Sequence, residues 1–369
     1  MSGGRPIPFV DLRPGEDADV LRAAFERVVA RGWYVLGPEV EAFEAEFAAA
    51  SGARFAIGVG NGTDAIALLL RAIGVGPGDE VIVPALTAAF TGLAVIAAGA
   101  RPVVADVEPG TLTLDPAACA AAVTDRTRAI VPVHLYGQAA DLDALGTIAA
   151  RHGLALVEDC CQAHLATSRG TPVGTRGSGG AFSFYPTKNL GALGDGGAVI
   201  TNDSAIAQRI RRLRNGGQSD RYRHVEAGVN SRLDEIQAAL LRARLPRLTP
   251  WTARRRELAA LYRRLLPPAI QPIHERDAGH VYHLFPVRSP SRDALRESLS
   301  AQAIETLIHY PVTLADQPAF AAYRPDACPV AADAARSLLS LPLHPRLDDA
   351  DVARVAAAVT EHQKGRVPA

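Results

Sequence analysis

The sequence predicts an α/β protein with a large domain and a smaller one, built around a mainly parallel sheet. Short apolar segments rich in β-branched residues alternate with amphipathic helical segments along the chain. Several of the strand-like segments are apolar throughout, which is typical of parallel strands that are buried on both faces. The length of 369 residues is enough for two or three domains with a large core.

The first part of the chain carries most of the expected strands. Before them, Val40, Phe43 and Phe47 recur at i, i+3 and i+7 and indicate one apolar stripe of a helix. Helices are expected between most of the strands, for example at 63–74 and 142–153. The expected strands lie at 55–60, 80–84, 102–107, 129–137, 154–159, 180–185 and 196–202.

The pattern changes near residue 230. Long helices rich in Arg, Leu and Ala are expected at 233–248 and 251–266. A strand, a helix and a second strand are then expected at 280–288, 291–302 and 305–311. We therefore expect the large domain to comprise residues 1–248, with a helical segment at its start, and the small C-terminal α/β domain to comprise residues 249–369.

Composition excludes several classes of protein. The chain has 39 basic and 39 acidic residues, so it lacks the net positive charge of a nucleic-acid binder or a polybasic membrane protein. No apolar run approaches the roughly 18 residues needed to span a bilayer, and the start of the chain has no pattern of a secretory signal. The four cysteines form no CxxC pair and fit neither a disulfide framework nor a zinc site, so we expect a cytoplasmic protein without a metal: Cys119, Cys160, Cys161 and Cys328.

Lysine is nearly absent from the chain. Only two of the 39 basic residues are lysines, Lys188 in a glycine-rich central segment and Lys364 near the end. Arginine serves wherever a cation is sufficient, but only lysine deprotonates readily and forms a Schiff base. Lys188 is therefore a candidate for covalent chemistry, although a coding bias toward arginine that spared one lysine is an alternative explanation.

A glycine turn after the strand at 55–60 is a candidate phosphate cradle. Asn61, Gly62, Thr63 and Asp64 lead from that strand into a helix, whose N-terminus offers free N–H groups and a positive dipole to an anion. A nicotinamide cofactor would require an acidic residue at the end of the next strand. The acidic pair 79–80 opens that strand instead, and no Walker sequence follows the turn.

A second and a third segment add chemistry to the cradle. Glu158 and Asp159 end a strand at the edge where α/β folds bind ligands, although an N-cap is the alternative role of such an aspartate. Lys188 lies between Ser183 and a run of glycines, three residues after Tyr185. A phosphate cradle, a carboxylate and a lysine are the groups that pyridoxal phosphate needs: the lysine holds its aldehyde and the carboxylate keeps its ring nitrogen protonated.

These segments together resemble the DegT/DnrJ/EryC1/StrS family of sugar aminotransferases, which are pyridoxal-phosphate enzymes of fold type I. The resemblance extends over nearly the whole chain and includes GWYVLGPEVEAFE, GNGTDA, GVGPGDEVIVPA, VPVHLYGQ, VEDCCQAH, FSFYPTKNLGALGDGG, NSRLDEIQAAL, HVYHLF and IHYP. It implies a large domain with a mainly parallel mixed sheet and a smaller C-terminal domain.

The resemblance also implies roles for individual residues. Lys188 would bond to the cofactor aldehyde and later act as the acid and base, and Asp159 would pair with the pyridine nitrogen. Gln162 would lie beside the ring, and Ala88 would lie on its face where many relatives have an aromatic residue. The phosphate would be held by Gly62, Thr63, Ser183 and, from the other subunit, Asn230. Tyr185, His309 and Tyr310 are the expected substrate contacts, although the segment after IHYP lacks the proline and histidine of many relatives.

The activity implied by the resemblance is the transfer of an amino group from L-glutamate to the C-3 ketone of a dTDP-3-keto-6-deoxyhexose, in the biosynthesis of an antibiotic deoxyamino sugar. Pyridoxal 5′-phosphate would be the cofactor, with pyridoxamine 5′-phosphate as its intermediate form, in a homodimer with shared active sites. Alternatives are a C-4 aminotransferase for a dTDP- or UDP-4-keto-6-deoxyhexose, an inosose aminotransferase, and a sugar-nucleotide sensor on the same fold. Lys188 favours transamination, because relatives with histidine at this position do not transaminate.

Overall fold

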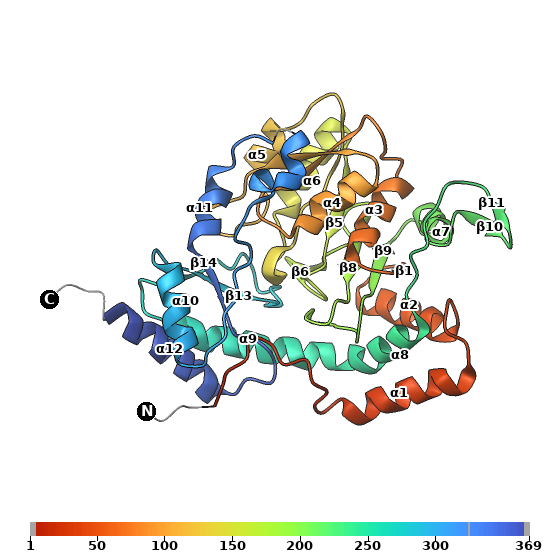
Figure 1. Ribbon diagram of the computed structural model, residues 1–369. Coiled ribbons are helices and arrows are strands. Elements are labelled where there is room, and N and C mark those ends of the chain that lie inside the picture. The colour runs from red at the N-terminus through yellow and green to blue at the C-terminus, as the bar shows by residue number, and fades with distance from the viewer. Residues whose placement is uncertain (1–4, 324, 365–369) are drawn as a thin grey trace.

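The computed structural model describes residues 5–323 and 325–364, which form a large and a smaller sheet surrounded by helices, together with two short hairpins (Figure 1). The larger sheet has seven strands in the order β1-β9-β8-β5-β4-β2-β3. All of its strands run in one direction except β9, which pairs antiparallel with both β1 and β8. The predicted α/β class with a mainly parallel mixed sheet is therefore confirmed.

The strands of this sheet lie close to the predicted ranges. They are β1 (Phe55–Val59), β2 (Glu80–Pro84), β3 (Arg101–Ala105), β4 (Thr127–Ile130), β5 (Ala155–Asp159), β8 (Gly179–Ser183) and β9 (Gly197–Thr201). Apolar side chains on both faces explain the match. Val81 and Val83 enter one core cluster while Ile82, between them, enters another, so β2 is buried on both sides as the continuous apolar pattern indicates.

Helices cover both faces of the large sheet and connect its strands. Phe43 and Phe47 of the predicted stripe are fully buried and pack edge-on against Phe184, which confirms the helix expected there. The helices that precede residue 230 are α1 (Ala18–Arg31), α2 (Pro38–Ala50), α3 (Gly62–Ala72), α4 (Ala89–Ala97), α5 (Pro116–Ala121), α6 (Leu142–His152) and α7 (Ser204–Leu213). The predicted long helices are α8 (Glu235–Arg244) and α9 (Leu248–Leu265), which run along one side of the molecule (Figure 1).

The smaller sheet corrects one expected strand. It consists of β12 (Gln271–Pro272), β13 (Phe285–Arg288) and β14 (Leu338–Leu341), all antiparallel, with α10 (Arg292–Ala301), α11 (Pro329–Ser337) and α12 (Asp349–Lys364) around it. The segment 305–311 was expected to be a strand and is not, since it contributes only one isolated bridge from Leu307 to Ser340. The completely buried β14 occupies the place beside β13 instead, because its apolar residues can cover both faces of the sheet.

A second correction concerns the segment 129–137, which was expected to be one long strand. Strand β4 ends at Ile130, because Pro132 has no N–H to donate to the sheet and Tyr136 adopts a φ of 61° that reverses the chain. The reversal directs this segment across the carboxyl ends of the strands. The division at residue 249 stays a prediction.

Short hairpins complete the described fold. They are formed by β6 (Thr167–Ser168) with β7 (Thr171–Pro172), and by β10 (Gln218–Asp220) with β11 (Arg223–His224), which projects from the body (Figure 1). In the described ranges, no helix combines the length and the apolar character required to cross a membrane. All four cysteines are free thiols, and the cytoplasmic location stays a prediction.

A buried carboxylate fixes the end of β5. Glu158 is completely buried and accepts hydrogen bonds from the backbone N–H groups of Gly174 (2.6 Å), Arg176 (2.9 Å) and Gly177 (3.3 Å). Its Oε2 also lies 3.0 Å from His134 Nε2. Because His134 Nδ1 accepts from the N–H of Ala140, the proton of the neutral ring lies on Nε2 and is donated to Glu158. The carboxylate thus joins three segments at one strand end.

We expect Glu158→Ala to lower the free energy of unfolding by about 3–5 kcal/mol, because it leaves several buried donors without an acceptor. Urea unfolding would measure the loss. Glu226→Ala is the matched control: Glu226 pairs with two half-exposed arginines at the surface, so its removal should cost less than about 1 kcal/mol. Equal losses in the two variants would contradict the role given to Glu158.

Candidate active site

The carboxylate of Asp159 lies at the carboxyl end of β5 and is held from two sides. Thr91 Oγ1 donates to its Oδ2 at 2.8 Å, and the N–H of Cys161 donates to its Oδ1 at 3.1 Å. Thr91 lies 3.1 Å from the hydroxyl of Thr87, so a short relay from α4 supports the carboxylate. Asp159 is only 4% exposed. Because each carboxylate oxygen accepts one of these bonds, they fix the orientation of the Asp159 side chain.

Lys188 lies on the loop between β8 and β9, in the same region as Asp159. Its backbone N–H donates to the carbonyl of Tyr185 at 2.8 Å, which makes a tight turn. Burial lowers the pKa of its amine below the ordinary value, although the nearby Cys161 and Asp159 act in the opposite direction. The amine is therefore easier to deprotonate than that of a solvated lysine.

Gly62 and Ser183 meet at the N-terminus of α3. A Cβ atom on Gly62 would lie 2.7 Å from Ser183 Cβ and 2.8 Å from Cys161 Sγ, so only glycine fits there. Asn61 caps the helix by accepting the N–H of Asp64 at 2.8 Å. The helix terminus, its free N–H groups and a serine thus form a compact surface suited to an anion.

The other predicted cofactor contacts lie around this surface. Thr63, in the first turn of α3, and Ala88, the residue before α4, are both half-buried. Asn230 is exposed and forms an isolated bridge with Asn215. Its neighbour Ser231 donates to Asp64 at 2.6 Å. The described chain therefore presents Asn230 to the outside.

Gln162 connects the site to the predicted substrate segment. Its Oε1 accepts the N–H of Tyr136 at 2.7 Å, and its Nε2 donates to the hydroxyl of Tyr310 at 2.9 Å. The hydroxyl of Tyr136 in turn donates to the carbonyl of His309. His309 and Tyr310 are thereby tied to the carboxyl edge of the large sheet. Tyr185 is 52% exposed.

Two histidines near Lys188, His164 and His283, were not found as site residues from the sequence, whereas His309 was expected as a substrate contact. The pKa of His164 is lowered to about 3 and that of His309 to about 4, in each case by burial first and by Lys188 second. The pKa of His283 is lowered well below its ordinary value by the same two causes. The imidazoles are thus neutral at pH 7 and add no cation beside the amine. The spacing of these histidines along the sequence does not indicate that they gather around Lys188.

Among the described residues, His134, Glu158 and Cys160 have ligand atoms close enough together for a metal. Both nitrogens of His134 are already engaged, one as a donor and one as an acceptor, and Glu158 already accepts four hydrogen bonds. The donor set is therefore used in holding the fold.

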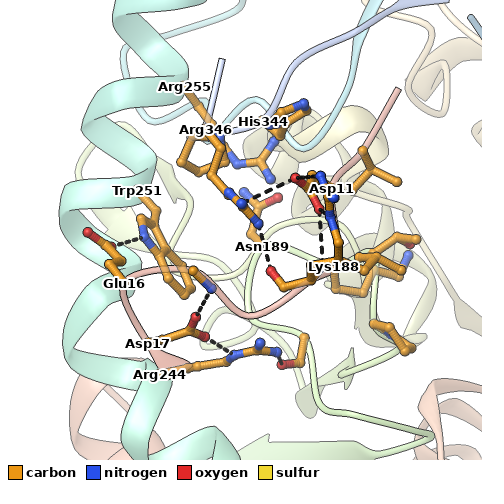
Figure 2. Close-up of a pocket in the computed structure, with 18 of the residues that line it drawn as sticks. Asp11, Glu16, Asp17, Lys188, Asn189, Arg244, Trp251, Arg255, His344 and Arg346 are labelled. Atoms are coloured by element: carbon orange, nitrogen blue, oxygen red, sulfur yellow. Dashed lines mark hydrogen bonds and ion pairs between the residues drawn. The ribbon is translucent and has the colours of Figure 1, made fainter. Parts of the chain in front are cut away.

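A cavity of about 610 Å³ adjoins the Lys188 loop (Figure 2). Its walls come from the segments 10–17, 186–193, 244–255 and 344–346. The part played by the N-terminal segment was not predicted, because this wall depends on contacts between residues more than 300 positions apart, such as Asp11 with Arg346.

The residues of the site fit pyridoxal phosphate. The cradle at Gly62 excludes any side chain, and it lies beside Ser183 at a helix N-terminus. The buried Asp159 and the amine of Lys188 are close enough to influence each other electrostatically. This set offers an anion surface, a carboxylate and an easily deprotonated amine in one place, as that cofactor requires.

Comparison with known proteins extends this description. The model of the DegT/DnrJ/EryC1/StrS aminotransferase family matches residues 16–360. The dTDP-3-amino-3,4,6-trideoxy-alpha-D-glucose transaminase of Streptomyces venezuelae is 49% identical over 364 residues, 96% of each chain. The erythromycin biosynthesis sensory transduction protein EryC1 of Saccharopolyspora erythraea is 50% identical over 348 residues, covering 92% of this chain and 95% of that protein. The crystal structure of S. venezuelae DesV in complex with ketimine intermediate has a TM-score of 0.96 and 48% identity, covering 99% of this chain and 100% of that one.

The lowered pKa of Lys188 predicts a distinct pH dependence of amine labelling. With only two lysines in the chain, mass spectrometry can follow Lys188 separately. On cofactor-free protein, its labelling midpoint should lie below pH 10.5. Asp159→Asn should lower the midpoint further, because the carboxylate favours the ammonium form. A midpoint at or above 10.5 in the unmodified protein would contradict the prediction.

Proposed function

The chain belongs to the DegT/DnrJ/EryC1/StrS aminotransferase family, and we propose that it moves an amino group to the C-3 ketone of a dTDP-3-keto-6-deoxyhexose. The observation that carries the proposal is the half-buried Lys188, the one lysine in the interior of the sequence, whose amine interacts electrostatically with Asp159. The position of the amine in the product follows the name of the S. venezuelae relative, which makes a 3-amino sugar. The product would be a building block of an antibiotic deoxyamino sugar.

Pyridoxal phosphate is the cofactor that the site fits. When bound, it supplies an aldehyde that accepts and returns an amino group and a ring that withdraws electrons. Gly62, Thr63 and Ser183 would hold its phosphate. Ala88 would lie on the face of its ring, and Gln162 would lie beside that ring.

Lys188 and Asp159 divide the catalytic work. Lys188 would hold the aldehyde and then, once released, use its Nζ to take up and deliver a proton beside the substrate. Its lowered pKa suits both directions of proton transfer. Asp159 would keep a proton on the ring nitrogen, and its two bound donors hold the carboxylate in one orientation.

The partners follow from the same reasoning. L-Glutamate is the proposed amino donor and a nucleotide-linked keto sugar the acceptor. Tyr185, His309 and Tyr310 are the proposed sugar-side contacts, and the tie through Gln162 supports the last of these. We further propose a homodimer in which the exposed Asn230 reaches the phosphate in the partner subunit.

The alternative functions have less support. A C-4 aminotransferase or an inosose aminotransferase would use the same Lys188 but another acceptor. The name of the S. erythraea relative includes sensory transduction, yet a sensor has no need for an amine whose pKa is lowered by burial. Amino transfer therefore has the strongest chemical basis.

The experiment that tests the function is incubation with a panel of keto sugars and L-glutamate, with mass and NMR analysis of the products. We expect the 3-amine from dTDP-3-keto-6-deoxyglucose, its galacto epimer or the 4-deoxy sugar, and at least 100-fold less product from the nucleotide-free sugar, because binding energy that orients the ketone is lost. Lys188→Ala should give no product and no borohydride-reducible cofactor on the chain. Efficient formation of a 4-amine, or amination of scyllo-inosose, would refute the proposed substrate.

Subunit mixing tests the shared site. Lys188→Ala and Asn230→Asp should each be inactive or strongly impaired alone, the second because a carboxylate repels the phosphate. Each hybrid dimer contains one site with both intact groups, so it should have up to about half the activity of a normal dimer. A random equal mixture of the two variants should therefore regain up to about a quarter of normal activity. If hybrids form and stay inactive while Asn230→Asp alone is inactive, Asn230 acts within its own subunit.

A further inference from the structure

The cavity beside the Lys188 loop contains a group of basic side chains to which the proposed function assigns no role. Figure 2 shows Arg255, Arg346 and His344 gathered in one part of the cavity, with Lys188 further along it. Arg255 comes from α9, and His344 follows β14. The two residues thus belong to the side of the molecule that packs around the smaller sheet.

The cavity lining carries more cations than carboxylates. Six cationic side chains and three carboxylates line it: Arg13, Lys188, Arg244, Arg254, Arg255 and Arg346, with Asp11, Glu16 and Asp17. The carboxylates are already engaged. Asp11 pairs with Arg13 and Arg346, Asp17 pairs with Arg244, and Glu16 accepts from Trp251. Arg254 pairs with Glu257 and Asp349, which lie outside the lining, so among the cations that line the cavity Lys188 and Arg255 have no ion pair with a described carboxylate.

Arg255 is buried without a counter-ion. It is 6% exposed, and among the described residues no carboxylate lies within ion-pair distance of it. Its Nη1 donates to the carbonyls of Tyr282 (3.3 Å), His283 (3.4 Å) and Leu343 (2.8 Å), which carry no net charge, and its Nε has no partner. Burial lowers its pKa to about 10, so it is still a cation at pH 7. A buried cation of this kind is costly unless an anion approaches it.

His344 lies beside it with unused hydrogen-bonding capacity. It is 5% exposed, and neither ring nitrogen has a partner at bonding geometry. Burial and then the neighbouring Arg255 lower the pKa of its ring to about 4, although the carbonyl of Pro8 acts in the opposite direction, so the imidazole is neutral at pH 7. Buried polar groups in proteins are nearly always hydrogen-bonded. An unpartnered imidazole next to an uncompensated guanidinium therefore indicates a ligand that accepts hydrogen bonds.

We propose that Arg255 and His344 form an oxyanion-binding subsite of this cavity, which takes a carboxylate or phosphate group of a small molecule. A guanidinium N–H and an imidazole N–H both donate, and a planar or tetrahedral oxyanion accepts from both while supplying the missing negative charge. At about 610 Å³ the cavity has room for such a group with the rest of a small ligand attached.

The identity of the ligand rests on the proposed function. An aminotransferase for nucleotide sugars has two anionic substrates, a dicarboxylic amino donor and an acceptor with a pyrophosphate. Both present the same chemistry to Arg255, so the subsite alone does not distinguish them. Glutarate and inorganic pyrophosphate are the non-reacting probes of the two sources.

Isothermal titration of the holoenzyme with each probe tests the proposal. We expect one-to-one binding of at least one probe, weakened at least 10-fold by Arg255→Gln and by His344→Phe. Arg296→Gln is the matched control, because Arg296 is an exposed arginine on α10 outside the cavity, and it should leave binding unchanged. His344→Phe keeps the carbonyl contacts of Arg255, so the test stands even if Arg255→Gln fails to fold.

The outcomes distinguish a subsite for the amino donor from one for the sugar nucleotide, and they distinguish failure of the subsite from failure of the proposed function. Binding of glutarate alone identifies a subsite for the donor carboxylate, and binding of pyrophosphate alone identifies one for the sugar nucleotide. If neither probe binds, or if both cavity variants bind like the control, the subsite is refuted. Neither probe undergoes amino transfer, so a failed product assay with intact, Arg255-dependent binding would refute the proposed function and leave the subsite standing.

Discussion

The structure depends on how the carboxyl end of β5 is held. Glu158 is buried with four donors directed at it, from His134 and from the turn at 174–177. The next residue is Asp159, whose carboxylate faces the site. A buried carboxylate with complete hydrogen bonding is rigid, because any rotation leaves both it and its donors unpaired. Asp159 is therefore positioned by Glu158, a neighbouring residue whose own carboxylate does not face the site.

The environment of Lys188 balances two opposing effects. Burial favours the neutral amine, while Cys161 and Asp159 favour the ammonium. The surrounding imidazoles of His164, His283 and His309 are themselves kept neutral by burial and by the lysine. A fixed cation in their place would lower the pKa of the amine further and would compete for the carboxylate. Neutral rings fill the space without disturbing that balance.

The sequence predicted those features that depend on local pattern. The strands match because their apolar runs report burial on both faces, and Asp159 and Lys188 lie near each other because both follow strands that end at one edge. The prediction of a strand at 305–311 was wrong. Several apolar segments can compete for the place beside β13, local pattern does not decide among them, and β14 takes that place. The contact of Tyr136 with His309 had no signal, because it requires a chain reversal and a link between residues 173 positions apart. The cofactor contacts, including Asn230, remain proposals.

The scarcity of lysine has a chemical consequence at this site. An enzyme that holds an aldehyde cofactor must direct it to one amine, and any other accessible amine nearby can react with it. Every other cation that lines the cavity is an arginine, which carries a positive charge and forms no Schiff base. Lys364, at the end of α12, lines a separate surface pocket with residues of that helix and Leu265. In the proposed function, arginine would perform the binding and a single lysine would perform the covalent chemistry, so that electrostatic attraction of substrate and capture of the cofactor would not interfere.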